Sequence, residues 1–250
     1  MDHDTPELAS FPAPLHAVVF GARGGIGRAF VQALAADERV ASVTAVSRRP
    51  VDWALPGVRP RVADLLDEDS IAAVAEDCRP TPPRLVIVAT GLLHGGELRP
   101  EKSLQDLDPQ RLARVFAVNA TGPALVLKHF APLLPRTGKS VIAALSARVG
   151  SISDNRLGGW YAYRASKAAL NQLLRTASIE LARRWREACI VGLHPGTVAT
   201  PLSAPFSANV DPQKLFTPAR SASCLLAVID RVGPADSGRC LAWDGSVVEP

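Results

Sequence analysis

The feature that most restricts the fold is a short apolar run that leads through a glycine-rich loop into a helical segment. Residues 15–20 (LHAVVF) have the length and composition of a buried strand, and residues 25–36 have the apolar spacing of a helix. The loop between them holds Gly21, Gly25 and Gly27. Glycines let a pyrophosphate approach the backbone, and a helix N-terminus offers free N–H groups. The unit therefore predicts a dinucleotide site, with a flexible turn as the alternative interpretation.

Short apolar runs alternate with helical segments along the rest of the chain. This alternation predicts an α/β fold with a parallel sheet covered on both faces, and 250 residues fit one such domain. We expect residues 1–14 to be a flexible leader and residues 15–250 to form the domain. Pro123 should kink the longest helix just past Asn119. The strands are predicted at 15–20, 42–47, 59–62, 85–90, 139–145, 189–193 and 239–243, and the helices at 25–36, 69–77, 109–133, 163–184 and 218–231.

Composition narrows the classes of partner. Apolar residues make up 47% and charged residues 21%, as in ordinary globular proteins. The net charge of +4, with scattered arginines, is too small to indicate nucleic-acid binding. No apolar run approaches the ~20 residues of a membrane span, and the acidic N-terminus is unlike a signal peptide. The four cysteines lack metal-ligand spacing. We expect a cytoplasmic protein without a metal, nucleic-acid or membrane partner.

Tyr163 and Lys167 stand four residues apart in a helical run, so they share one helix face. A phenol titrates near ~10, and a neighbouring ammonium lowers its pKa. Such a pair can act as a general acid and base that interconverts an alcohol and a carbonyl. By itself the spacing also occurs on solvated helix faces. Tyr161 has Ala165 four residues on and forms no such pair; with Trp160, we expect it in or beneath a substrate pocket.

These motifs occur together in an order that resembles the short-chain dehydrogenase/reductase family. The resemblance extends over about residues 15–248, and the stretches SARVGSISDN and GGWYAYRASK resemble its C-factor-like, carbonyl-reductase-like branch. It implies a Rossmann-type doubly wound sheet of seven strands in the order 3-2-1-4-5-6-7, and a homodimer. The matching residues are Gly21, Gly25 and Gly27, Asn119 in FAVNATG, Ser146 in ALSARVG, Tyr163 and Lys167, and Pro195 and Gly196 in HPGTVAT.

The resemblance also implies a mechanism, in which a hydride passes between a nicotinamide and the carbon of a small-to-medium carbonyl or alcohol. Tyr163 would transfer the hydroxyl proton, Lys167 would lower its pKa and bind the nicotinamide ribose, and Asn119 would support a water relay. Ser146 would hold the substrate oxygen. The implied cofactor contacts are Gly21, Arg23, Gly25, Ile26, Gly27, Arg48, Asp64, Leu65, Gly91, Asn119, Tyr163, Lys167, Pro195, Gly196, Val198 and Thr200.

The serine assignment stays open at the level of sequence. Alignment on Gly150 puts Ala147, rather than Ser146, at the position usual in the family, and Ser151 and Ser153 are further candidates.

The charge of the residues that end the second predicted strand indicates which nicotinamide cofactor binds. The second predicted strand ends at Ser47-Arg48-Arg49, where NAD-specific relatives carry an acid. Arg48 and Arg23 could both meet a 2′-phosphate, so we expect NADP(H) in preference to NAD(H). Arg49 alone is interpreted as a solvated turn residue. Asp64 either contacts adenine or caps the following turn.

The fourth strand departs from the family pattern. It continues as VATG, so Gly91 is kept while two amides are lost. His94 is expected at the substrate rim or the surface. A cofactor-binding signalling protein with little turnover is the alternative function, and a transcriptional regulator is a third. The intact Tyr163 and Lys167 favour an enzyme.

Overall fold

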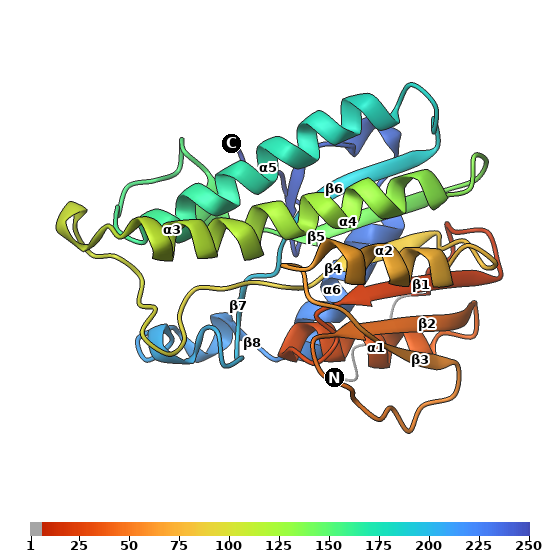
Figure 1. Ribbon diagram of the computed structural model, residues 1–250, viewed down its shortest axis with the longest axis horizontal. Coiled ribbons are helices and arrows are strands. Elements are labelled where there is room, and N and C mark those ends of the chain that lie inside the picture. Colours follow the sequence, from red (N-terminus) through yellow and green to blue (C-terminus); the bar gives the residue numbers. More distant parts are fainter. Residues whose placement is uncertain (1–6) are drawn as a thin grey trace.

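The computed structural model describes residues 7–250 and contains a seven-stranded sheet between two layers of helices (Figure 1). The strand order is β3-β2-β1-β4-β5-β6-β9, and all neighbouring pairs are parallel. This confirms the predicted order, because two short strands, β7 (Thr197–Val198) and β8 (Leu215–Phe216), pair separately. The seven strands are β1 (Leu15–Phe20), β2 (Val40–Ser47), β3 (Val58–Val62), β4 (Leu85–Val88), β5 (Ser140–Leu145), β6 (Ala188–His194) and β9 (Cys240–Ala242).

The helices cover the two faces of the sheet because strand side chains alternate between them. On β1, Ala17 and Val19 join a core with α1 (Gly25–Ala36) and α6 (Pro218–Arg231). Val18 and Phe20 join the core of the opposite face, where Phe20 meets Phe130 edge-on at 5.4 Å. That face is covered by α2 (Glu68–Asp77), α4 (Gly122–Phe130) and α5 (Tyr161–Leu181). Burial on both faces explains why the central strands are nearly continuous apolar runs, whereas the edge strand β3 is mostly exposed.

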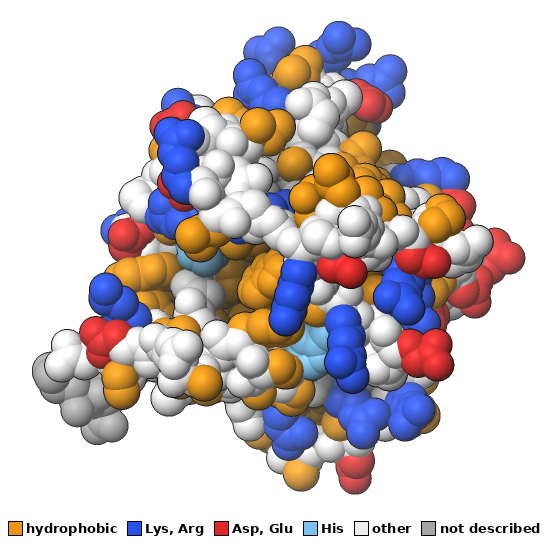
Figure 2. All heavy atoms as spheres, turned by 90° about the vertical axis from the view of Figure 1, so that its left-hand side faces the viewer, with side chains coloured by type: hydrophobic (Ala, Val, Ile, Leu, Met, Phe, Trp, Pro, Cys, Tyr) orange, Lys and Arg blue, Asp and Glu red, His pale blue; other side chains and the backbone are white. Residues whose placement is uncertain are grey.

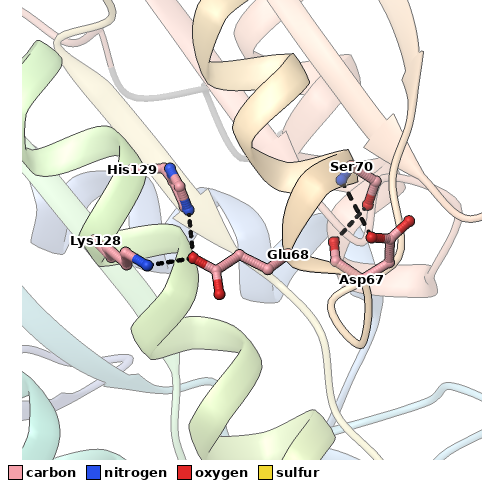
Figure 3. Close-up of polar contacts among 5 residues, drawn as sticks. All are labelled: Asp67, Glu68, Ser70, Lys128 and His129. Carbon is pink, nitrogen blue, oxygen red and sulfur yellow. Dashed lines mark hydrogen bonds and ion pairs between the residues drawn. The ribbon is translucent and has the colours of Figure 1, made fainter.

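Glu68 ties two of these helices together, as Figure 3 shows. Its carboxylate on α2 accepts hydrogen bonds from Lys128 and His129 of α4. Beside it, the carboxylate of Asp67 accepts from the backbone N–H of Ser70 and so caps the start of α2. None of the described helices combines the length and hydropathy needed to cross a membrane.

The long helix predicted over 109–133 is interrupted. It consists of α3 (Pro109–Phe116), a π-helical turn (Ala117–Thr121), α4 and a short 3₁₀ turn. Pro123 has no N–H and cannot donate to the carbonyl of Asn119 one turn earlier. The N–H of Gly122 instead reaches back five residues, to the carbonyl of Ala117. The predicted break near Asn119 therefore takes the form of a π-turn, which leaves the Asn119 carbonyl outside the regular ladder.

The flexible leader expected over residues 1–14 is wrong for its described part, and residues 1–6 lie outside the described residues. Leu8 and Phe11 are buried in the core beside α1. The hydroxyl of Ser10 donates to the carboxylate of Asp230 at 2.6 Å, and the Leu8 N–H donates to Asp37 at 3.1 Å. Two apolar residues flanked by prolines are too short a pattern to reveal this anchoring from sequence.

Candidate active site

A cleft of about 710 Å³ lies at the carboxyl ends of β1 to β4. It is bordered by the glycine loop, the end of β2, residues 63–66 after β3 and residues 89–92 after β4. Figure 2 views the molecule from this side and shows a hollow walled by hydrophobic side chains, with Lys and Arg side chains around it. The strand order reverses between β1 and β4, which is where doubly wound sheets bind ligands. The predicted residues Gly21, Arg23, Arg48, Asp64, Leu65 and Gly91 all line the cleft.

Close contacts explain the glycines of the loop. A Cβ on Gly27 would lie 2.1 Å from the carbonyl oxygen of Gly21, and one on Gly21, at φ +80°, would lie 2.9 Å from that of Ala89. A Cβ on Gly25 would meet the methyl of Thr200 at 2.8 Å, so the loop packs against another predicted cofactor residue. No side chain caps the N-terminus of α1, so its first N–H groups stay available to an anion. Ile26 packs into the core below.

Four arginines border the cleft: Arg23, Arg48, Arg49 and Arg114. Within residues 7–250, none of their guanidinium groups forms an ion pair or a hydrogen bond, and all four residues are exposed. Arg49, interpreted from sequence as a solvated turn residue, is exposed and also borders the cleft. Arg114 was missed. The available signal was helical spacing, because Arg114 stands four residues before Val118, which lines the same cleft.

Asp64 serves as a turn residue at the edge of this cleft. Its carboxylate accepts from the N–H of Leu66 at 3.0 Å, and its own N–H donates to the Ser70 hydroxyl at 3.0 Å. The capping interpretation is therefore present in the structure, while the position of Asp64 keeps it within the cleft lining.

Tyr163 and Lys167 lie in the first two turns of α5 and are both buried, at 9% and 2% exposure. The Lys167 ammonium donates to the carbonyl of Leu145 at 2.7 Å and lies 5.8 Å from the centre of the Tyr163 ring. Burial lowers the pKa of Lys167 to about 8. Burial also raises the pKa of Tyr163 to about 12. The expected lowering of the phenol pKa is therefore absent from the protein alone, because desolvation of the phenolate outweighs the effect of the lysine.

Asn119 braces the loop after β4. It is fully buried, its Oδ1 accepts from the Leu92 N–H at 2.7 Å, and its Nδ2 donates to the Leu92 carbonyl at 2.8 Å. The same amide donates to the hydroxyl of Ser166 at 3.1 Å, next to Lys167 on α5. The Asn119 side chain thus braces the loop after β4, where the sequence lacks the two amides of the family pattern.

The structure does not bring a serine hydroxyl to Tyr163. Ser146 is buried and donates to Oδ1 of Asn171 at 2.6 Å, because even-numbered side chains of β5 face α5 and Ser146 continues that alternation. The hydroxyls of Ser151 and Ser153 lie 3.3 Å apart, and Ser153 donates to the carbonyl of Pro250. Ala147, the alternative position from the alignment on Gly150, is half-buried.

Aromatic rings extend outward from Tyr163. The Trp160 ring lies 6.2 Å from that of Tyr163 and 4.9 Å from that of Phe206. His94 lies 5.5 Å from Phe206, and its Nε2 lies 3.0 Å from the carbonyl of Leu202. His94 therefore joins the loop after β4 to the segment that follows β7, in agreement with a rim position. Tyr161 begins α5.

The predicted residues after β6 do not line the cleft, and one of them reaches the glycine loop. Gly196 has φ +77°, and a Cβ there would lie 3.2 Å from the Trp243 ring. The Pro195 carbonyl accepts from the Ser221 hydroxyl at 2.9 Å, and the buried Val198 belongs to β7. The contact of Thr200 with Gly25 brings this segment to the glycine loop. No cluster of metal-binding side chains occurs among the described residues.

Known proteins share this arrangement. The profile of the short chain dehydrogenase family matches residues 15–211. The chain belongs to this family. It is 37% identical to the C-signal of Myxococcus xanthus over 146 residues, 58% of this chain and 82% of that protein. It is 34% identical to 1-hydroxy-2-glutathionyl-2-methyl-3-butene dehydrogenase of Rhodococcus sp. (strain AD45) over 143 residues, 57% of this chain and 60% of that one.

Among solved structures, the NADPH-bound carbonyl reductase from chicken fatty liver superimposes with a TM-score of 0.83 at 26% identity, over 96% of each chain. The protein is thus a short-chain dehydrogenase/reductase that resembles the C-signal and carbonyl reductases. The cleft fits the family's nicotinamide dinucleotide. The close contacts at Gly21, Gly25 and Gly27 admit no side chain, so the loop presents bare backbone to a ligand. Moreover, the buried hydroxyl of Thr90 in the cleft wall has no partner among the described residues.

Proposed function

We propose that the protein is an NADP(H)-dependent oxidoreductase that interconverts a small-to-medium carbonyl compound and its alcohol. The observation that carries the proposal is the buried pair of Tyr163 and Lys167, which Asn119 links to the cleft through its hydrogen bonds to Leu92 and Ser166. Nothing in the packing of α5 requires a lysine in that interior position. Because the burial of an ammonium is energetically unfavourable, a lysine kept there indicates a function. The bound nicotinamide would supply or accept the hydride, and the protein residues would position the substrate and move the proton.

The protonation state of Tyr163 suits reduction. Since burial raises its pKa to about 12, the phenol keeps its proton at neutral pH and can donate it to the oxygen of a carbonyl. Lys167 favours the phenolate that results from this donation, and Asn119 would hold the water through which Lys167 exchanges protons with solvent. The ammonium of Lys167 would also bind the nicotinamide ribose.

The arginines support the preference for NADP(H). Arg23 and Arg48 border the part of the cleft between the glycine loop and the end of β2, where an adenosine ribose binds in this fold. No carboxylate stands at the tip of β2 to bind a ribose hydroxyl, and guanidinium groups suit a 2′-phosphate.

Ser146 stays our candidate for holding the substrate oxygen, on the condition that its hydroxyl turns away from Asn171. A comparison of Ser146→Ala with Ala147→Ser distinguishes the two positions. Loss of turnover in Ser146→Ala supports Ser146. Normal turnover in that variant, with a gain in Ala147→Ser, would instead mean that Tyr163 binds the oxygen without a serine.

The assembly and the substrate follow from weaker signals. Leu173 and Ile179 expose 38% and 51% of their surface on α5, which agrees with the predicted homodimer. The rings of Trp160 and Phe206, and the absence of Lys and Arg between residues 201 and 213, favour an uncharged substrate. The cytoplasmic location stays a prediction. The signalling alternative is not favoured, because a protein that only binds cofactor would not need a buried Tyr163.

Titration with nucleotides tests the proposal. NADPH and NADH are added while tryptophan fluorescence is followed, and NADPH oxidation is then measured with a panel of aldehydes, ketones and quinones. We expect NADPH to bind at least about tenfold more tightly than NADH, which corresponds to ~1.4 kcal/mol, and at least one panel compound to be reduced. Equal affinities would contradict the cofactor assignment.

A further inference from the structure

The chain enters α5 through a backbone conformation that is unusual for its residues. Gly158, Gly159 and Trp160 have φ values of +64°, +62° and +53° in succession. Two glycines adopt this left-handed region readily, but a bulky tryptophan rarely does. Such strain persists only where the surroundings hold it, and it is concentrated at functional sites. Here it lies directly before Tyr163, in the first turn of the same helix.

A buried residue from a distant loop contacts this turn at two points. The backbone carbonyl of Glu101 accepts from the Trp160 N–H at 2.6 Å, and its carboxylate accepts from the Ala162 N–H at 3.1 Å. Glu101 is only 4% exposed. Trp160 occupies the N-cap position of α5 and has no side-chain oxygen, so Glu101 supplies the cap from 61 residues away. From the other side, the Arg164 guanidinium donates to the carbonyl of Gly159 at 3.0 Å.

The acidic caps of the other α-helices are different in kind. Asp67 caps α2 within its own turn, through the N–H of Ser70 (Figure 3), and Asp108 caps α3 in the same way through Arg111. Both act on residues three positions on in the sequence. The burial of a carboxylate is energetically unfavourable unless it is hydrogen-bonded, so a buried acidic cap is less expected than an exposed one. Glu101 is the buried one of the three, and it serves the helix that carries Tyr163 and Lys167.

We propose that Glu101 is a positioning residue for the reaction, which holds Trp160 in its left-handed conformation and thereby fixes the Tyr163 phenol against the substrate. The inference rests on the proposed function for its catalytic consequence. Without the carboxylate, the Ala162 N–H loses its acceptor and the turn relaxes toward an ordinary conformation. The Trp160 ring then moves relative to the rings of Tyr163 and Phe206, whose centres lie 6.2 and 4.9 Å from its own.

The test compares Glu101→Ala and Glu101→Gln with Asp67→Ala, a matched loss of a helix cap on α2, which carries neither Tyr163 nor Lys167. Hydrogen–deuterium exchange of the peptide spanning residues 158–165 reports on the turn without requiring turnover. The kcat for a reducible panel compound and the Kd for NADPH report on the site. Glutamine keeps an oxygen that can accept from Ala162, so it distinguishes a lost hydrogen bond from a lost charge.

We expect Glu101→Ala to speed exchange in this peptide by about tenfold or more. We also expect it to lower kcat by about 100-fold, the effect of a small misplacement of a reacting group, with NADPH affinity unchanged. Glu101→Gln should recover most of both losses, and Asp67→Ala should leave both readouts near wild type. Unchanged exchange in Glu101→Ala, or equal losses of kcat in Glu101→Ala and Asp67→Ala, would overturn the inference. Wild-type protein that binds NADPH but reduces no panel compound would instead count against the proposed function, and the exchange measurement would still decide whether Glu101 holds the turn.

Discussion

Basic side chains at the two ends of the sheet differ in their hydrogen-bond partners. At the amino end, the chain provides the partners: Lys139 donates to Ser10 and to the carbonyl of Asp230, and Arg39 donates to the carbonyl of Phe11 at 2.9 Å. At the carboxyl end, the guanidinium groups of Arg23 and Arg48 meet no acceptor among the described residues. One end is completed by protein contacts, and the other leaves charge for an anionic ligand.

This contrast separates stability from function. Changes at the amino end should lower the free energy of unfolding and leave cofactor affinity alone. Changes at the carboxyl end should lower cofactor affinity and leave the free energy of unfolding alone.

The largest effect on cofactor affinity is expected from Gly27→Ala. The new Cβ would lie 2.1 Å from the carbonyl oxygen of Gly21, so the loop must move away from its cofactor-binding shape. NADPH affinity should fall by at least about 100-fold, or ~2.7 kcal/mol, as measured by fluorescence titration. Gly233→Ala is the matched control outside the cleft, because a Cβ there meets nothing within 4 Å. Equal affinities of the two variants would contradict the loop assignment.

The anchored N-terminal segment should behave in the opposite way. Phe11 is 2% exposed, so Phe11→Ala should lower the free energy of unfolding by about 3–5 kcal/mol. Urea denaturation measures this loss, and NADPH titration of the folded variant should give the wild-type Kd. A loss below about 1 kcal/mol would mean that this segment contributes little to the core.

A smaller effect is expected from Arg48→Ala. It removes one of the groups that we assign to the 2′-phosphate, so the NADPH Kd should rise by about tenfold, or ~1.4 kcal/mol. NADH binding should not change, since that nucleotide lacks the phosphate. Arg39→Ala at the amino end should lower the melting temperature without altering either Kd. If Arg48→Ala weakened both nucleotides equally, the assignment of Arg48 to the 2′-phosphate would be wrong.

The smallest effect is a pH dependence of stability. Burial lowers the pKa of Lys167 to about 8 from its ordinary 10.5, so above pH 8 the unfolded chain holds more protons than the folded protein. The free energy of unfolding should therefore rise with pH, by at most about 1.4 kcal/mol per pH unit. Burial raises the pKa of Cys189 to about 12 and that of Cys240 to about 11, and these thiols oppose the rise above pH 9.

Lys167→Met isolates the lysine contribution. Urea denaturation of wild type and variant between pH 8 and 9 should give a difference in unfolding free energy that grows in favour of wild type as pH rises. A constant difference would show that Lys167 titrates normally in the folded protein.

The sheet could be predicted from the sequence because each of its signals is local. The strands are short apolar runs, the glycines are required by contacts within the loop and with β4, and Pro123 disrupts its own helix. The strand order was implied by the resemblance to the family, because local patterns do not say which strands are neighbours.

The remaining features depend on contacts between distant parts of the chain. Ser10 meets Asp230 across 220 residues, and Glu101 caps α5 across 61. The direction of the Ser146 hydroxyl follows from strand alternation together with an acceptor on α5, Asn171. The raised pKa of Tyr163 follows from burial, which the four-residue spacing to Lys167 does not reveal.

We propose that Tyr163 is the acid that donates a proton to the carbonyl oxygen of the substrate. The most direct measurement is NADPH oxidation by the panel of carbonyl compounds with wild type, Tyr163→Phe and the matched control Tyr161→Phe. We predict turnover by wild type and Tyr161→Phe, and a kcat lower by about 10²–10⁴-fold in Tyr163→Phe with unchanged NADPH affinity. Turnover by Tyr163→Phe at the wild-type rate would contradict the account.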